Sequence, residues 1–126
     1  MILNLSEHSA ETLQQQLVQQ IRALILSGDV EHNSELPSIR ALAAEQKVSV
    51  ITVQRAYETL ERHGLIRARR GKGFQVVALH PKDRKRLAQA RFEEAVQPHL
   101  EQGQAEGLSA GELLASVGRI LDGVPS

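Results

Sequence analysis

The sequence predicts a mainly α-helical fold, in which a winged helix-turn-helix domain of three helices and a small β-hairpin precedes a short α-helical dimerisation tail. Three observations in residues 36–77 predict it. Two short amphipathic helical patterns occur in succession, and the turn Lys47-Val48-Ser49 between them has the length typical of a helix-turn-helix. Two short β-patterns about a glycine-containing turn follow directly. We expect the winged domain to span residues 1–78 and the helical tail residues 79–126.

The first helix is expected over residues 10–27. Residues 1–8 lack a helical period, whereas apolar residues then recur on one face from Leu13 to Ile25. Ser9 is the expected N-cap, and Gly28 stands where a left-handed residue can end the helix. Beyond the loop, Leu36 is expected as a minimal strand, and Pro37 fixes the start of the next helix.

The two helices of the motif are expected over residues 38–46 and 50–63. In the second, Ser49 is the expected N-cap and Gly64 the stop. Helical spacing places an apolar set inward, and the polar residues between them are left outside. The inward set comprises Ile39, Leu42 and Ala43 in the first helix and Val53, Ala56, Tyr57 and Leu60 in the second.

The wing and the tail complete the predicted order of elements. Strands are expected over residues 65–69 and 74–77. Pro81 can begin a helix in which Pro98 predicts a kink. A loop is expected over residues 103–107, and the capping box of Ser109 and Glu112 opens a last helix.

The apolar stripes of the two tail helices cannot be buried by those helices alone. They must cover the first domain or pair with a second copy of the chain. We expect dimerisation through Phe92, Val96, Leu100, Leu113, Leu114, Val117 and Leu121.

Composition excludes several classes of function. The 126 residues contain no cysteine, which rules out disulfides, thiol catalysis and cysteine-ligated zinc. No apolar run approaches a membrane span, and no signal-peptide pattern opens the chain, so we expect a cytoplasmic protein. The five histidines lack ligand spacing, and no nucleophile has a base at hand. We therefore expect no metal, no cofactor and no enzymatic activity.

Charge distribution points to a nucleic-acid partner although the net charge is zero. Residues 1–35 hold one basic and five acidic residues, residues 36–77 hold eight and three, and residues 78–126 hold six and seven. The positive charge is thus confined to the predicted winged motif, and such clustering favours binding to a polyanion. Gly71-Lys72-Gly73 lacks the spacing and the following Ser or Thr of a nucleotide-binding loop.

The motifs resemble the DNA-binding domain of GntR-type bacterial transcription factors. The resemblance covers residues 10–77 and rests on spaced motifs in order: residues 15–21 and 25–28, Leu36-Pro37-Ser38-Ile39-Arg40-Ala41-Leu42-Ala43, Val48-Ser49, residues 52–58, Leu60-Glu61, Gly64-Leu65-Ile66 and Gly71-Lys72-Gly73. The short two-helix tail is similar to that of the YtrA-like branch. In that branch the tail serves dimerisation, and members often repress operons that encode ATP-driven transporters.

The resemblance implies DNA contacts from three parts of the motif. They are Arg40, the residues Ser49, Thr52 and Gln54 at the start of the recognition helix, and the wing tip Arg70, Gly71 and Lys72. We add the neighbouring Ser38, Val50, Ile51, Arg55 and Arg69 as candidates.

The sequence departs from the family pattern in three places, which involve four residues. Lys47 stands where glycine is usual, so we expect it to adopt a left-handed conformation. Val50 and Ile51 replace residues that are often polar or arginine. Gln75 replaces the usual aromatic residue of the wing, with Phe74 beside it, which raises the possibility of a different wing register.

The chemistry of these residues suggests distinct roles. Arg40, Arg70 and Lys72 can neutralise phosphates. One arginine in isolation would be read as a solvated surface charge, but a basic hairpin tip next to a helix-turn-helix favours DNA contact. Gln54 can bond an adenine edge or remain an exposed helical glutamine. Val50 or Ile51 can contact thymine methyl groups, or one of them can pack internally.

These observations predict a homodimeric transcriptional regulator on an inverted-repeat operator of double-stranded DNA. The resemblance alone favours a repressor over an activator. Two alternatives stay open. One is an effector-gated regulator with a small-molecule site between the tail and the winged domain. The other is a winged-helix module that binds protein.

Overall fold

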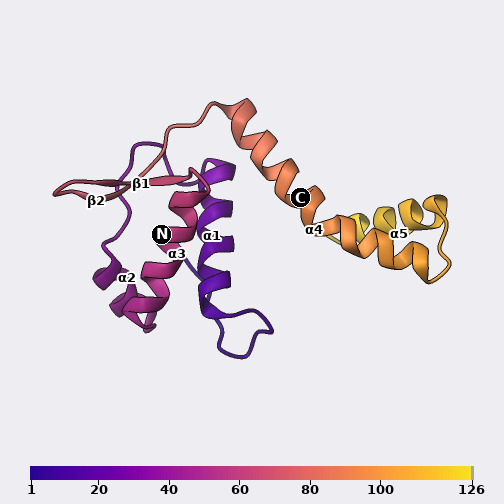
Figure 1. The fold of residues 1–126 in the computed structure, drawn as a ribbon, viewed down its shortest axis with the longest axis horizontal. Helices are drawn as coiled ribbons and strands as arrows, with labels where there is room; N and C mark the ends of the chain where they lie inside the picture. The colour runs from indigo at the N-terminus through magenta and orange to yellow at the C-terminus, as the bar shows by residue number, and fades with distance from the viewer. Residues whose placement is uncertain (126) are drawn as a thin grey trace. The chain divides into compact units, whose positions relative to one another are not determined.

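The computed structural model describes residues 1–125 and has the predicted architecture (Figure 1). In chain order the elements are α1 (Leu13–Ser27), α2 (Ile39–Gln46), α3 (Val50–Arg62), β1 (Ile66–Arg69), β2 (Gly73–Val76), α4 (Pro81–Ala105) and α5 (Ala110–Asp122). The chain divides into two compact units, and the boundary falls between Lys85 and Arg86, inside α4. The functional domain boundary after residue 78 stays a prediction.

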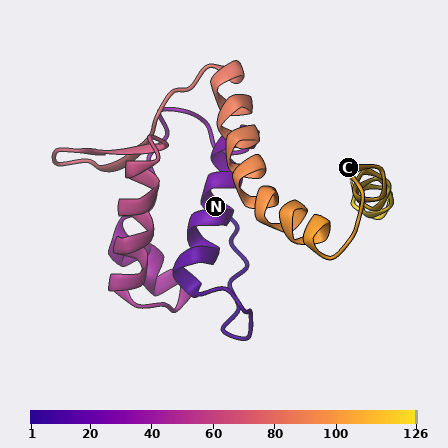
Figure 2. The same ribbon diagram turned by 45° about the vertical axis from the view of Figure 1, so that its right-hand side comes forward.

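The core of the first unit lies where α1 and α2 pack against α3 (Figure 2). The inward set predicted for α2 and α3 is buried, apart from the half-buried Ile39. The hairpin adds Leu65, Ile66 and Val76 to this core. Helical periodicity therefore identified the buried faces because each helix buries one continuous stripe.

Helix α1 begins three residues later than predicted, and Ser9 is not its N-cap. Thr12 is the N-cap. Its hydroxyl accepts a hydrogen bond from the backbone amide of Gln15, and the Gln15 side chain accepts one from the backbone amide of Thr12. This reciprocal pair satisfies two amides at once, which a single serine further upstream would not do. The predicted end is confirmed, since Gly28 has the left-handed φ of 87°.

Two glutamines of α1 hold the N-terminal arm. The side-chain amide of Gln16 accepts from the Ser6 backbone amide at 2.8 Å and donates to the Ser6 carbonyl at 2.8 Å. Gln20, one turn later, makes the same two-way pair with Asn4 at 2.7 and 2.8 Å. The arm is thus paired to one face of α1 without forming a strand.

The turn between α2 and α3 has the predicted left-handed lysine. Lys47 ends α2 with φ 57° and ψ 44°, and its amide donates to the Ala43 carbonyl. Ser38 and Ser49 cap α2 and α3 by accepting the amides of Ala41 and Thr52. A lysine pays a small steric cost here that glycine would avoid.

The hairpin pairs Ile66 with Val76 and Arg69 with Gly73 in an antiparallel register. The predicted minimal strand is displaced by one residue, because Glu35 forms the isolated bridge, with Gln75. Leu36 instead donates its amide to the Phe74 carbonyl and buries its side chain in the core. Alternation along an extended chain allows only one of two neighbours to face the core, and the apolar one does so.

In the second unit, the predicted loop at residues 103–107 begins too early. Helix α4 contains Pro98 and continues through Gly103 to Ala105. An added Cβ on Gly103 would lie 2.7 Å from Leu113 Cδ2, so this glycine allows the close approach of α5 and does not break the helix. The capping box of Ser109 and Glu112 is confirmed, and the hydrogen bond from the Ser109 amide lowers the pKa of the Glu112 carboxyl.

The tail helices leave most of their apolar stripe uncovered within one chain. Phe92 is 63% exposed and Leu114 is 73% exposed, and Leu100, Val117 and Leu121 are exposed as well. Val96 and Leu113 are half-buried. Across residues 1–125, no helix has both the length and the apolar character needed to cross a membrane.

Candidate nucleic-acid interface

The first turn of α3 presents two apolar side chains to solvent. Val50 is 45% exposed and Ile51 is 55% exposed, whereas Val53 in the same turn is fully buried. Ser49 precedes them as the N-cap, and its hydroxyl lies 2.8 Å from that of Thr52. Capping therefore fixes the start of α3 and with it the outward direction of Val50 and Ile51.

The next turn of α3 carries the polar candidates. Gln54 is exposed, and its side-chain amide donates to Glu58 at 3.3 Å, one turn further on. Arg55 is also exposed. The Gln54 amide thus has a weak, solvent-facing partner that another acceptor could replace.

The tip of the hairpin is a tight turn with two basic side chains. Gly71 and Gly73 adopt positive φ values of 74° and 73°, which allow the chain to reverse where other residues would be strained. The Lys72 amide donates to the Arg69 carbonyl at 2.8 Å and closes the turn. Arg70 and Lys72 are exposed at this tip.

Arg69 is held along the hairpin by contacts that the sequence did not reveal. Its guanidinium donates to Gln75 Oε1 at 2.8 Å, and Gln75 Nε2 donates in turn to the Asn33 carbonyl at 2.6 Å. Gln75, which departs from the family pattern, therefore links the wing to the loop before α2. Asn33 lies 42 positions away, so no local pattern could have identified this link.

Tyr57 joins the elements that carry the candidate residues. Its hydroxyl donates to the Pro37 carbonyl at 2.7 Å, directly before the α2 cap. Its ring meets Phe74 of β2 edge to face, with the centroids 5.0 Å apart. Burial, and secondarily the negative charge of Glu45, raise the pKa of the phenol. A protonated Tyr57 thus connects α3 to α2 and to the wing.

The predicted DNA-contacting residues come from α2, α3, the N-caps of these two helices and the hairpin, all in the first unit. The hairpin and α2 lie on the same side of α1 as α3 (Figures 1 and 2). Thr52 is half-buried, whereas the other candidates are exposed: Ser38, Arg40, Ser49, Val50, Ile51, Gln54, Arg55, Arg69, Arg70, Gly71 and Lys72. Their individual contacts with DNA stay predictions.

A helix-turn-helix with an exposed second helix and a basic hairpin defines the class of winged helix-turn-helix DNA-binding proteins. The chain belongs to the gntR family of bacterial regulatory proteins, whose sequence profile matches residues 13–76. The predicted family is therefore confirmed, and the protein is a DNA-binding transcriptional regulator.

Similar proteins support this assignment and the YtrA-like branch. The HTH-type transcriptional repressor YtrA of Bacillus subtilis is 35% identical over 75 residues, which cover 60% of this chain and 58% of YtrA. The uncharacterised regulator YhcF of the same organism is 27% identical over 91% of this chain and 94% of its own. A GntR family regulator from Listeria monocytogenes superposes with a TM-score of 0.74 at 26% identity, covering 88% of this chain and 96% of its own.

Proposed function

We propose that the protein is a homodimeric repressor that binds an inverted-repeat operator. The observation that carries the proposal is an exposed first turn of α3 together with an exposed basic hairpin tip, on elements that lie on the same side of α1 (Figures 1 and 2). Helix α3 enters the major groove, while Arg70 and Lys72 neutralise backbone phosphates. Ser38 and Arg40 at the start of α2 add contacts to the backbone.

Base readout in this proposal is partly apolar. Val50 and Ile51 approach thymine methyl groups, and Gln54 exchanges its bond to Glu58 for an adenine edge. Ser49, Thr52 and Arg55 surround these residues, and Gln75 keeps Arg69 on the hairpin. The operator is therefore expected to contain thymine within each half-site.

Dimerisation is supported by the exposed stripe on α4 and α5. Exposed apolar side chains gathered on two helices are typical of an interface, because water contact with such a surface is unfavourable. A second copy offers the same stripe, and two-fold symmetry matches an inverted repeat. The stripe comprises Phe92, Val96, Leu100, Leu113, Leu114, Val117 and Leu121, with Leu113 also packed at Gly103.

Repression is supported by the 35% identity to a protein that is itself named a repressor. A dimer seated on a promoter would block access of the polymerase. By family resemblance, the regulated genes are expected to encode an ATP-driven transporter.

The test is selection of duplexes from a random library by the full-length protein. The expected product contains two inverted half-sites with centres about 34–36 Å apart, or a multiple of that distance. Selection of single, unrepeated sites would refute the dimeric binding mode. Recovery of unenriched sequence would refute the operator proposal.

A further inference from the structure

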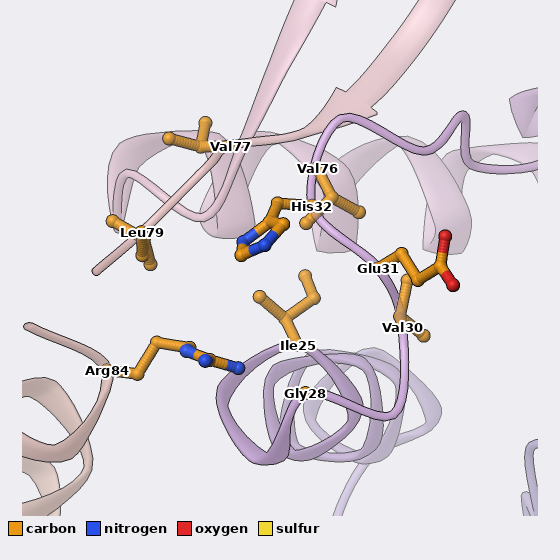
Figure 3. Close-up of a pocket in the computed structure, with 9 residues that line it drawn as sticks. All are labelled: Ile25, Gly28, Val30, Glu31, His32, Val76, Val77, Leu79 and Arg84. Carbon is orange, nitrogen blue, oxygen red and sulfur yellow. The ribbon is translucent and has the colours of Figure 1, made fainter. Parts of the chain in front are cut away.

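A cavity of about 360 Å³ lies in the first unit, and none of its lining residues is a candidate DNA-contacting residue (Figure 3). It is bounded by the end of α1, the loop after it, the segment after β2 and the first turn of α4. Its lining includes Ile25, Val30, His32, Val77, Leu79 and Arg84. This volume is at the lower end of the range for small-molecule sites.

Arg84 is the polar feature of this cavity that the fold does not explain. Its Nε atom is buried and has no hydrogen-bond partner among the described residues. Buried donors are nearly always paired, because an unpaired one loses its hydration without replacement. The Arg84 side chain extends toward Gly28 and Ile25, while the Glu31 carboxylate turns away from it (Figure 3).

Gly28 leaves the space that the guanidinium occupies. An added Cβ at this position would lie 2.7 Å from Arg84 Nη1. The end of a helix favours a nearby cation, which accounts for a positive charge at this place. It does not account for the unpaired Nε or for the cavity beside it.

The geometry points to a binding site for a small organic carboxylate in this cavity. The guanidinium of Arg84 would pair with the carboxylate, as its planar fork is suited to do. His32 would lie beside the ligand, and Ile25, Val77 and Leu79 would contact its aliphatic part. The inference goes beyond the proposed function, because it assigns a ligand to a cavity lined by none of the candidate DNA-contacting residues.

Heteronuclear NMR with isovalerate tests the site on the full chain without DNA. We expect saturable shifts of the backbone amides of Gly28, His32 and Leu79 in the millimolar range, as suits a small ligand with one charged contact. Isovaleramide, which has the same shape without the charge, should give no saturable shifts. Inorganic phosphate should bind more weakly than isovalerate, because it lacks the aliphatic part.

Two variants and one control complete the test. Arg84→Gln and, separately, the cavity-filling Leu79→Trp should each abolish the saturable shifts while the circular dichroism spectrum stays native. Arg91→Gln removes an exposed arginine of the same helix outside the cavity and should bind isovalerate like the wild type. Three results would each overturn the proposal. They are no saturable shifts in the wild type, unchanged isovalerate binding by folded Arg84→Gln, and an affinity for phosphate or isovaleramide equal to that for isovalerate.

Failure here would leave the proposed function intact. The NMR readout contains no DNA, and duplex selection contains no carboxylate. The two results are therefore independent.

Discussion

The hydroxyl of Tyr57 in α3 donates a 2.7 Å hydrogen bond to the backbone carbonyl of Pro37, twenty residues earlier. Ser38, which caps α2, follows directly. One side chain thereby fixes where α2 begins relative to α3. The edge contact with Phe74 extends the same restraint to the wing.

Tyr57→Phe should lower the free energy of unfolding by about 1–2 kcal/mol, because the Pro37 carbonyl loses its donor while the ring packing is retained. Urea unfolding followed by circular dichroism measures this change. Gln54→Ala, on the exposed face of α3, should change the free energy by less than about 0.5 kcal/mol. Equal stability of Tyr57→Phe and the wild type would contradict the role given to this hydrogen bond.

Alkaline pH should remove the advantage of tyrosine at this position. The pKa of Tyr57 is raised in the folded state above its ordinary value of 10.0, first by burial and second by Glu45. Its contribution to stability is therefore complete below the unfolded pKa and is lost as pH rises above it. The difference in unfolding free energy between the wild type and Tyr57→Phe should shrink above pH 10.0.

The chain has a single tyrosine and no tryptophan, so tyrosinate absorbance reports this group directly. As pH rises, tyrosinate absorbance should appear over the same pH range in which the chain unfolds. Ionisation in a chain that is still folded, at the pH where a free phenol ionises, would contradict the burial argument.

Helices α2 and α3 could be predicted from the sequence because their signals are local. A serine cap, an apolar residue every three or four positions and a terminal left-handed residue all lie within one short segment. The same reasoning identified Lys47 as left-handed and Ser109 with Glu112 as a capping box. The candidate interface residues could be proposed from the sequence for the same reason, since most of them occupy the caps, first turns and hairpin turn of these elements.

Contacts between residues far apart in the sequence could not be predicted in this way. Gln75 reads as an isolated exception to the family pattern until Asn33 and Arg69 are seen on either side of it. Gly103 reads as a helix stop until Leu113 is found against it. Arg84 reads as one basic residue among several until its buried Nε is placed in a cavity.

Ile51→Ala should weaken discrimination at a thymine of the selected operator by about 1 kcal/mol, roughly fivefold. The reason is loss of apolar contact with the methyl group. Competition between the selected duplex and one with uracil at that thymine measures it. Because Ile51 is 55% exposed, urea unfolding should show little loss of stability. An unchanged preference at every thymine position would refute apolar readout by this residue.

Leu114→Glu should weaken the dimer about a hundredfold or more, because a carboxylate would be buried in the shared apolar stripe. Leu114 is 73% exposed in one chain, so the monomer should remain folded. Sedimentation across a concentration series measures the change. Ala115→Glu introduces the same charge on the neighbouring position and should leave the dimer unchanged. A wild type that is monomeric throughout, or equal behaviour of the two variants, would remove the basis for this interface.

Binding through α3 and the basic hairpin is tested most directly by fluorescence anisotropy on the selected operator and on a scrambled duplex across a salt series. The wild type should prefer the operator at physiological salt. Arg70→Gln with Lys72→Gln should weaken binding to both duplexes. It should also reduce the log-log salt slope by about four for the dimer, since two phosphate contacts are lost per chain. Arg91→Gln should behave like the wild type. Equal binding to both duplexes with an unchanged slope in the double variant would contradict the account.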